Sequence, residues 1–521
     1  MLYFYMVKTA EQSVKTTGER DAKIRSLETE NFHLKERIAW FERQVFGQKS
    51  ERFAEGFPPG LPELPGFVVP ESEKPKVELE VIPEHKRRKK SKGKNQYKVS
   101  YPDTLPVEEN VIDIPEEDRV HPKTGEELVE IGRDVTDKLG YRTSAYYIHR
   151  TVTVKYAVKN KPLSGIVQRP VPDCIITGSK FTPDFMAHIV TEKYAYHMPF
   201  YRIQEKLGSH EIKIERQTLS SLVMNIGFKL MPLYDLMKEL LFTCGYLFTD
   251  DTTVNMLDPG NGKTKTTRIW IYSSANPNAP PYQVYSFSPD RSHFYPTNFL
   301  KDFEGVIHAD AYQAYVKIDA DEQSGIDWAA CWCHARRYFE KIEAHDLELR
   351  DDILRKMRYL FMFERIAWQS EPVKRLEIRQ KYEKTIVDEI FKTLKAKVAD
   401  GTLLPKSNLA KAIGYMLNYE DNFKLYLIDP NIRMENNTAE RGLRKVVIGR
   451  KNWLFFGSKR AGESAAVIYS IVQTCRTIGI DPFAYLVDIF KKLMSHPHND
   501  LHELLPDQWA KSKSKGYETN R

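Results

Sequence analysis

The sequence is poor in cysteine and has no long apolar segment. It holds five cysteines in 521 residues, too few and too irregularly spaced for a disulfide framework, which indicates a reducing compartment. No stretch approaches the roughly 20 apolar residues that a membrane-spanning helix needs. The N-terminus opens with a short apolar run, but it has no basic region before that run and no small-residue cleavage site after a long apolar core, so no secretion signal is predicted. These absences predict a cytoplasmic protein.

The chain also lacks a strong overall charge, so the position of its basic residues matters more than their sum. The formal net charge is +7, from 78 Lys and Arg against 71 Asp and Glu. Seven basic residues, among them Arg87 and Arg88, stand within residues 86–94. This run can neutralise several DNA phosphates without reading the base sequence. A solvated run of charge explains it equally well.

A chain of this length is expected to form several structural units. Within residues 24–45, apolar residues recur at alternating spacings of three and four, which predicts a coiled coil. Asn31 falls on a core position, where a buried amide favours a parallel dimer in register. The pattern therefore predicts a homo-oligomer, a dimer or larger. An amphipathic helix that packs on its own chain is the alternative.

The next segments change character twice. Proline and charged residues dominate residues 53–100, which is typical of a flexible linker. Strand-like alternation then predicts a small β-rich module. The following short helices predict a helix-turn-helix in which a helix starting near Gln217 directs Thr218, Ser220 and Ser221 toward DNA. A plain helical connector is the alternative.

Further along, short β-rich runs separated by turns predict an α/β unit with a sheet. A long helix-like stretch then interrupts this unit before its second part. The chain is therefore predicted to be a multidomain α/β plus α protein. Its predicted units are a coiled coil (1–52), a basic linker (53–100), a β-rich module (101–175), a helix-turn-helix-like domain (176–242), two core parts (243–344 and 429–490) around a helical insertion (345–428), and a tail (491–521).

Three acidic residues stand where predicted elements end or begin. Asp250 lies in a hydrophobic strand, Asp310 ends the apolar run VIHAD, and Glu440 opens a predicted helix. Carboxylates placed in this way can converge on a pair of divalent ions, as metal-dependent phosphoryl transfer requires. Strand alternation puts Asp251 on the opposite face from Asp250, and the pattern alone does not choose between them.

Basic residues surround the third acid and follow it along the chain. Arg441, Arg444 and Lys445 share its predicted helix, which suits a nucleic-acid ligand. Residues 449–463 then mix basic with aromatic side chains, a combination that grips a backbone while stacking bases. The candidate DNA contacts in that segment are Arg450, Lys451, Trp453, Lys459 and Arg460. Core packing is the alternative for the aromatic residues, more so for Phe455 and Phe456 than for Trp453.

The segment from Cys331 to His334 contains two cysteines and a histidine, which are residue types that bind metals. No second cluster in the sequence provides the spacing of a structural zinc site. These cysteines are therefore predicted to be buried residues of a strand.

Several motifs in this order resemble the transposases of the insertion sequence 66 family. They are FGQKSER, KYAYHMPFYRIQE, FTDDTTV, GVIHADAY, CHARRYF, ENNTAERGLRKVVIGRKNWLFFGS and ELLPDQW. The resemblance implies a DDE-type enzyme with an RNase H-like core split by a helical insertion. It also implies that Asp250, Asp310 and Glu440 are the catalytic, metal-binding triad, with Mg²⁺ as the ion and Mn²⁺ as a substitute.

In one region the sequence departs from that family. Relatives carry a small zinc-binding module with two cysteine pairs, where this chain has His121, Thr124, Val158 and Lys161. A single histidine cannot hold a structural zinc ion. We therefore predict no structural zinc in this module and a fold that depends on its β core.

The leading hypothesis is a bacterial, nucleoid-associated DNA transposase. By resemblance, it would bind the terminal inverted repeats of its own element, hydrolyse the strand at the element's end and use the freed 3′-hydroxyl to attack target DNA. Accessory proteins of the same element are among the implied partners. Two alternatives remain open: a DNA-binding coiled-coil protein with a decayed nuclease core, and a nuclease without strand transfer.

Overall fold

The computed structural model describes residues 80–82, 99–121, 125–142, 145–158, 166–171, 174–258, 260, 262–274, 279–342 and 346–518. The predicted coiled coil and the basic run at residues 86–94 lie outside these residues. The chain divides into two units, the first comprising residues 1–189, 206–232 and 483–504, and the second residues 190–205, 233–482 and 505–521. Among the described helices, none has both the length and the apolar character needed to cross a membrane.

A five-stranded sheet forms the framework of the first unit. Its strands are β1 (Glu80–Ile82), β3 (Val107–Ile112), β4 (Leu128–Arg142), β5 (Ala145–Val158) and β6 (Ile166–Gln168). The long strands β4 and β5 pair antiparallel, β3 runs parallel to β5, and β6 joins β5 to β1. Ile114, Leu128, Val154, Tyr156 and Val167 form its buried cluster. Strands therefore occupy the region in which the sequence alternates.

Helices follow this sheet along the chain. They are α2 (Pro183–Tyr194), α3 (Phe200–Gly208), α4 (Arg216–Lys229) and α5 (Met231–Phe242), with a short strand pair, β2 (Val99–Ser100) and β7 (Lys213–Ile214), before α4. Helix α4 begins beside Gln217, as the sequence predicts. Thr218 is buried in the apolar interior, so the prediction that Thr218 faces DNA is wrong. Ser220 is half-buried.

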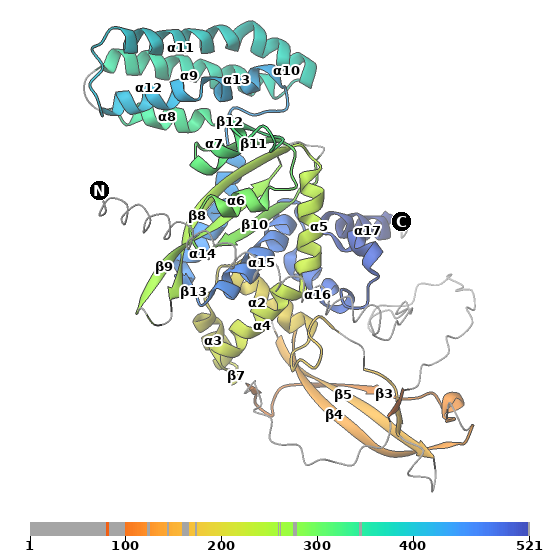
Figure 1. Cartoon of the computed structure of the whole chain (residues 1–521). Coiled ribbons are helices and arrows are strands. Elements are labelled where there is room, and N and C mark those ends of the chain that lie inside the picture. Colours follow the sequence, from red (N-terminus) through yellow and green to blue (C-terminus); the bar gives the residue numbers. More distant parts are fainter. Residues whose placement is uncertain are drawn as a thin grey trace, which may run out of the picture. The chain divides into compact units, whose positions relative to one another are not determined.

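A second sheet forms the centre of the second unit (Figure 1). Its strands are β8 (Tyr246–Asp258), β9 (Lys263–Ser273), β10 (Gln283–Ser288), β11 (Gly305–Ala309) and β12 (Ile326–Ala330). Their order is β10-β9-β8-β11-β12, and the short β13 (Phe455–Phe456) also pairs with β8. Strands β8 to β10 are antiparallel, whereas β11 and β12 run parallel to β8. All five strands of this order fall on the predicted β-rich runs.

Helices accompany this sheet, and their side chains also bond its two outer strands. These helices are α6 (Phe294–Phe299), α7 (Gln313–Asp319), α8 (Trp332–Glu340), α14 (Asn437–Trp453), α15 (Lys459–Thr477) and α17 (Pro506–Glu518). On β10, the N–H of Tyr285 donates to Ser470 Oγ of α15 at 2.8 Å. On β12, the N–H of Trp328 donates to Asp319 Oδ1 of α7 at 2.7 Å, and its carbonyl accepts from Asn422 Nδ2 of a further helix, α13 (Glu420–Ile428), at 2.8 Å.

A run of helices separates α8 from α14 (Figure 1). It comprises α9 (Leu347–Ala367), α10 (Pro372–Ile378), a π-helical turn (Arg379–Glu383), α11 (Lys384–Ala399), α12 (Asn408–Asn418) and α13 (Glu420–Ile428). Arg379 is fully buried at its centre and pairs with Glu364 at 2.5 Å. The same guanidinium donates to the carbonyls of Asp429 and Ile432. One buried cation therefore fixes the segment through which the chain returns to the sheet.

The other helices of the described residues are η1 (Glu116–Asp118), α16 (Pro482–Lys492) and η4 (His498–Leu504).

The start of β11 allows only a glycine, which gives a test of the strand arrangement. Gly305 has a φ of 132°, and a Cβ there would lie 2.3 Å from the carbonyl oxygen of Gly245. Gly305→Ala is therefore expected to lower the free energy of unfolding by about 2 kcal/mol or more. Gly414, inside α12, has open space around it, so Gly414→Ala is expected to raise this free energy by about 0.5–1 kcal/mol. Denaturant unfolding of both variants checks this. Equal effects would contradict the strand packing.

Candidate active site

Asp250 projects from β8, the central strand of the second sheet. One of its carboxylate oxygens, Oδ1, accepts the backbone N–H of Asp251 at 2.8 Å. Burial raises the pKa of Asp250 to about 7, and the nearby charges of Asp310 and Asp251 act in the same direction. Its negative charge is thus costly in this position unless a cation is close.

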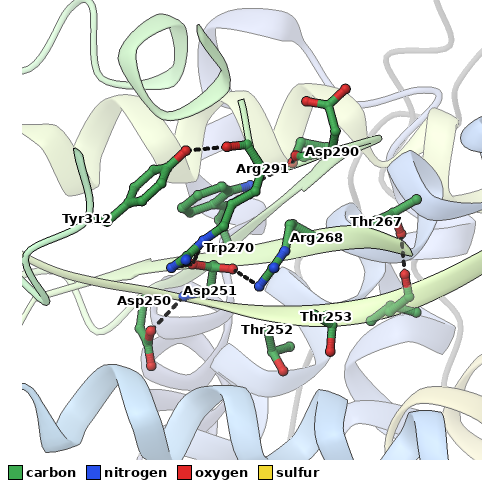
Figure 2. A network of polar contacts seen from close by, with 12 residues as sticks. Asp250, Asp251, Thr252, Thr253, Thr267, Arg268, Trp270, Asp290, Arg291 and Tyr312 are labelled. Carbon is green, nitrogen blue, oxygen red and sulfur yellow. Dashed lines mark hydrogen bonds and ion pairs between the residues drawn. The ribbon is translucent and has the colours of Figure 1, made fainter. Parts of the chain in front are cut away.

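Asp251 points to the other side of the strand. Figure 2 shows its carboxylate directed toward two arginines, away from Asp250. It pairs with Arg268 at 2.7 Å and with Arg291 at 2.8 Å, and its side chain is only 3% exposed. Because two guanidinium groups already neutralise Asp251, its carboxylate contributes to the stability of the fold. Of the two aspartates, Asp250 is therefore the better candidate for a metal ligand, a choice that the sequence pattern left open.

Asp310 directly follows β11 and lies beside Asp250. Strand β11 pairs in parallel with β8, with His308 opposite Phe248, and two further residues along each strand bring the two aspartates level. Burial raises the pKa of Asp310, while the charges of His334 and Arg291 lower it. Arg291 Nη2 lies 3.7 Å from Asp310 Oδ2. Two partly buried carboxylates thus lie side by side on the inner strand pair β8–β11 of the sheet.

Glu440 reaches the same region from the first turn of α14. The residue before this helix, Asn436, donates from Nδ2 to the carbonyl of Thr249 at 2.8 Å, and its N–H donates to Cys331 Sγ at 3.3 Å. These bonds fasten the helix start to β8 and to the end of β12. In this structure Arg337 of α8 donates to both carboxylate oxygens of Glu440 at 2.8 Å.

His334 stands among the three acids, although the sequence pattern did not nominate it as a site residue. Its Nε2 lies 4.0 Å from Glu440 Oε1, and its charge acts on both Asp250 and Asp310. Burial alone would lower the pKa of His334, but its contacts with Cys331 and the charge of Asp310 raise it. The available signal was spacing: His334 and Arg337, three residues apart at a helix start, share one helix face. Cys331 is fully buried and Cys333 partly buried, but the prediction that they lie in a strand is wrong, because Cys331 directly precedes α8 and Cys333 lies in that helix.

The acids have the donor chemistry for a divalent ion. Carboxylate oxygens are the ligands that Mg²⁺ prefers. A cation would offset both the cost of burying the charges of Asp250 and Asp310 and the repulsion between them. In the described residues, no three His, Cys, Asp or Glu side chains are grouped closely enough to hold a metal ion, and Glu440 is paired with Arg337. A three-carboxylate site therefore requires Glu440 to leave this arginine.

The predicted DNA contacts divide into exposed and buried residues. Arg441, Arg444 and Lys451 are exposed on α14, Lys445 is half-buried there, and Arg460 is exposed on α15. Lys459 lies 3.7 Å from Glu463. The exposed groups of α14 form one basic face of the helix that carries Glu440.

Two of the predicted contacts have structural roles instead. Trp453 is 9% exposed and stacks on Phe456, with ring centroids 4.9 Å apart, so the prediction that Trp453 stacks on bases is wrong. Arg450 donates to the hydroxyls of Thr252 and Thr253 on β8, at 3.1 and 2.7 Å, which ties α14 to the sheet. Phe455, expected to be buried, is instead exposed.

Comparison with known proteins gives matches along most of the chain. The family model described as "Transposase IS66 family" matches residues 178–464, a range that contains all three acids. The "IS66 C-terminal element" matches residues 470–506, and "Transposase C of IS166 homeodomain" matches residues 33–109. The uncharacterized protein y4hP of Sinorhizobium fredii is 30% identical over 409 residues, 75% of this chain and 73% of that protein. The uncharacterized protein y4jD of the same organism is 30% identical over 396 residues, 73% and 76% of the two chains.

The two neighbouring aspartates are expected to respond oppositely to removal of charge. Because its folded-state pKa is raised, Asp250 costs no stability at pH below about 4 and an increasing amount as pH rises through about 7. At pH 8 without divalent metal, Asp250→Asn is therefore expected to raise the free energy of unfolding by roughly 2–4 kcal/mol. Asp251→Asn leaves two arginines without their partner and is expected to lower it by about 2 kcal/mol.

Denaturant unfolding at pH 8 and pH 5 measures both variants. The gain from Asp250→Asn should shrink at pH 5, because the wild-type carboxyl is then largely protonated. A loss of stability in both variants, at both pH values, would contradict the conclusion that the charge of Asp250 destabilises the fold in the absence of a metal ion.

Proposed function

We propose that this chain, which belongs to the IS66 family of transposases, is a DDE-type enzyme. It would cut the ends of its insertion element and join them to target DNA. The observation that carries this proposal is the convergence of Asp250 and Asp310 on adjacent parallel strands. Glu440 approaches them on a helix that Asn436 fastens to the strand of Asp250.

We infer that the second unit is an RNase H-like core split by a helical insertion. Three antiparallel strands followed by two parallel strands, in the order β10-β9-β8-β11-β12, support this inference. The acids provide further support, since two of them lie on the central pair of strands and the third on α14. The helices α9 to α13 enter between β12 and α14, at the place where the sequence predicts the insertion.

In this proposal Asp250, Asp310 and Glu440 hold divalent ions, Mg²⁺ or in its place Mn²⁺. Bound ions would stabilise charge on the phosphate and lower the pKa of the attacking water. Asp250 and Asp310 already lie side by side on the strand pair β8–β11. Glu440 would join them as a metal ligand by giving up its pairing with Arg337. The freed guanidinium then faces the site, where it can bind a DNA phosphate in a bidentate manner.

The reaction consists of two displacements at phosphorus. First, water loses a proton as its oxygen bonds to the phosphorus at the element's end, and the departing 3′ oxygen takes up a proton. Second, the new 3′-hydroxyl loses its proton as its oxygen bonds to a target phosphorus, and the target's own 3′ oxygen leaves and takes up a proton. The second step exchanges one phosphodiester for another, so no energy source beyond the DNA itself is needed.

The proposed ligand is double-stranded DNA, both the terminal inverted repeats and the target. Matches to transposase families, one of them described as a homeodomain, support a DNA partner. The proposed contacts are Arg441, Arg444, Lys445, Lys451, Lys459 and Arg460, with Ser220, Arg87 and Arg88 from earlier segments. We further propose a homo-oligomer formed through the N-terminal coiled coil, in the bacterial cytoplasm at the nucleoid, assisted by accessory proteins of the element.

Loss of one acid is the direct test of this function. Purified protein is incubated with a duplex of the element's end and Mg²⁺, and nicking and joining are scored separately. Asp310→Asn is expected to reduce both rates roughly a thousandfold, because it removes several kcal/mol of transition-state stabilisation. The control is Asp327→Asn, an exposed carboxylate on β12, which should retain wild-type rates.

The same assay separates the alternatives. Equal rates for Asp310→Asn and wild type would refute the proposed site. Nicking without joining would identify a nuclease that lacks strand transfer, and DNA binding without either reaction would identify a decayed enzyme.

The proposed oligomer is tested by removal of its coiled coil. Deletion of residues 1–52 is expected to convert the wild-type assembly to monomers, because the apolar seam would supply the contact between copies. Sedimentation velocity on both proteins measures this. An oligomer that persists after the deletion would show that the interface lies elsewhere.

A further inference from the structure

The turn between α2 and α3 has a strained shape that two residues of α15 hold in place. His197 in this turn has a φ of 63°, a left-handed conformation that residues with side chains rarely adopt and that tends to mark functional sites. Arg476 Nη1 donates to the carbonyl of Ala195 at 2.7 Å, and Gln473 Nε2 donates to that of Tyr194 at 3.1 Å. The fold thus maintains this conformation against its cost.

The imidazole of His197 lies near two cations and lacks a partner of its own. A Cβ at Gly449 would lie 3.3 Å from His197 Nδ1, so the ring packs on α14 where that helix has no side chain. This Nδ1 is buried and forms no hydrogen bond. Burial lowers the pKa of His197, and the charges of Arg476 and Lys445 lower it further. Because Nδ1 is buried against α14, the ring nitrogen left to meet an anion is Nε2, and it does so beside the two cations.

Neither cation is neutralised within the described part of the chain. No carboxylate lies within ion-pair distance of Lys445 or of Arg476 there. Behind them, the ammonium group of Lys193 is buried against the rings of Phe200 and Trp453, at 4.2 and 5.4 Å. Burial lowers the pKa of Lys193 to about 7. The positive charge at this turn therefore comes from Lys445 and Arg476, because a lysine with this lowered pKa is only partly charged near neutral pH.

Exposed aromatic rings accompany this charge. Tyr196, next to His197, is 63% exposed, and Tyr201 at the start of α3 is 42% exposed. The guanidinium of Arg202 lies 5.6 Å from the ring centroid of Tyr201. Basic groups mixed with exposed aromatic rings are typical of surfaces that bind nucleic acid.

The position of the turn relative to the catalytic acids follows from the geometry of α14. At 3.6 residues per turn, Glu440 lies at one margin of the exposed face of this helix and Lys445 at the other. Arg441 and Arg444 lie between them on that face. A helix is about 10–12 Å wide, and successive phosphates of one DNA strand are about 3.4 Å apart along the duplex axis. A DNA strand that crosses α14 would thus place roughly three nucleotides between a phosphate at Glu440 and a phosphate at the turn.

We propose that Tyr196, His197, Lys445 and Arg476 form a binding site for the phosphodiester backbone of double-stranded DNA, across α14 from the catalytic acids. The site holds the duplex over the basic face of α14, so that the strand to be cut reaches Glu440. It contacts the backbone and not the base edges, so it acts on any sequence. This inference rests on the proposed function, because it assumes that DNA lies over α14.

The test measures DNA binding by the full chain without divalent metal, so that cleavage plays no part. Fluorescence anisotropy follows an element-end duplex and an unrelated duplex of equal length over a range of salt concentrations. Lys445→Gln is expected to weaken both equally, about three- to tenfold, and to reduce the slope of log K against log salt by about 0.9, the value for one lost phosphate contact. Lys392→Gln, on the exposed side of α11, removes the same charge and should bind like wild type.

A second variant separates the imidazole from the backbone shape. His197→Asn retains a residue that tolerates the left-handed conformation but removes the ring. It is expected to weaken both duplexes while the unfolding temperature stays at the wild-type value. Tyr196→Ala, which removes an exposed ring, should do the same.

The outcomes for this site and for the proposed enzyme are separable. Wild-type affinity and salt slope in Lys445→Gln would overturn the site even if the wild type cuts and joins DNA. Weakened binding of the element-end duplex alone would also overturn it, since that result indicates base reading. A wild type that binds with the expected slope but never cleaves would refute the enzyme and leave the binding site supported.

Discussion

Parallel pairing of β8 with β11 brings two partly buried carboxylates, Asp250 and Asp310, side by side in the middle of a sheet, and the surrounding structure accommodates the resulting repulsion. A third aspartate, Asp251, would make the position untenable if it shared their side of the strand. Strand alternation sends it to the opposite face, where Arg268 and Arg291 neutralise it. The fold thus neutralises Asp251 with two arginines and gives Asp310 one more distant guanidinium, that of Arg291 at 3.7 Å, while burial still raises the pKa of both Asp250 and Asp310.

The third acid, Glu440, reaches these aspartates only after the chain has passed through the five helices α9 to α13. Such an excursion has to end at a defined place, or the helix that carries Glu440 would start at the wrong point. Arg379 fixes the end of the helical run by bonding the carbonyls of the return segment, and Asn436 then bonds the carbonyl of Thr249. Burying a guanidinium is costly unless its donors are used, and each nitrogen of the Arg379 guanidinium donates to a carboxylate or carbonyl oxygen, so Arg379 specifies the position of the return segment.

Local pattern predicted the elements of the core but not the contacts between distant segments. The five β-rich runs became strands because alternation and burial are local properties, whereas the choice of Asp250 depends on Arg268 and Arg291, which are 17 and 40 residues away from Asp251. Trp453 resembled a surface residue because basic residues surround it in the sequence, although its stacking partner Phe456 follows three residues later. His334 was overlooked because adjacent cysteines made it look structural. The coiled coil stays a prediction.

The side chains that bond the outer strands also limit how copies of this protein can associate. An unpaired strand edge is a template for another chain, and proteins that expose one risk sheet-to-sheet aggregation. Here Ser470 covers part of β10, while Asp319 and Asn422 occupy the outward backbone groups of Trp328 on β12. Neither edge is a ready template for sheet extension. Crowding of many copies on one DNA molecule therefore does not by itself favour fibrillar growth through this sheet.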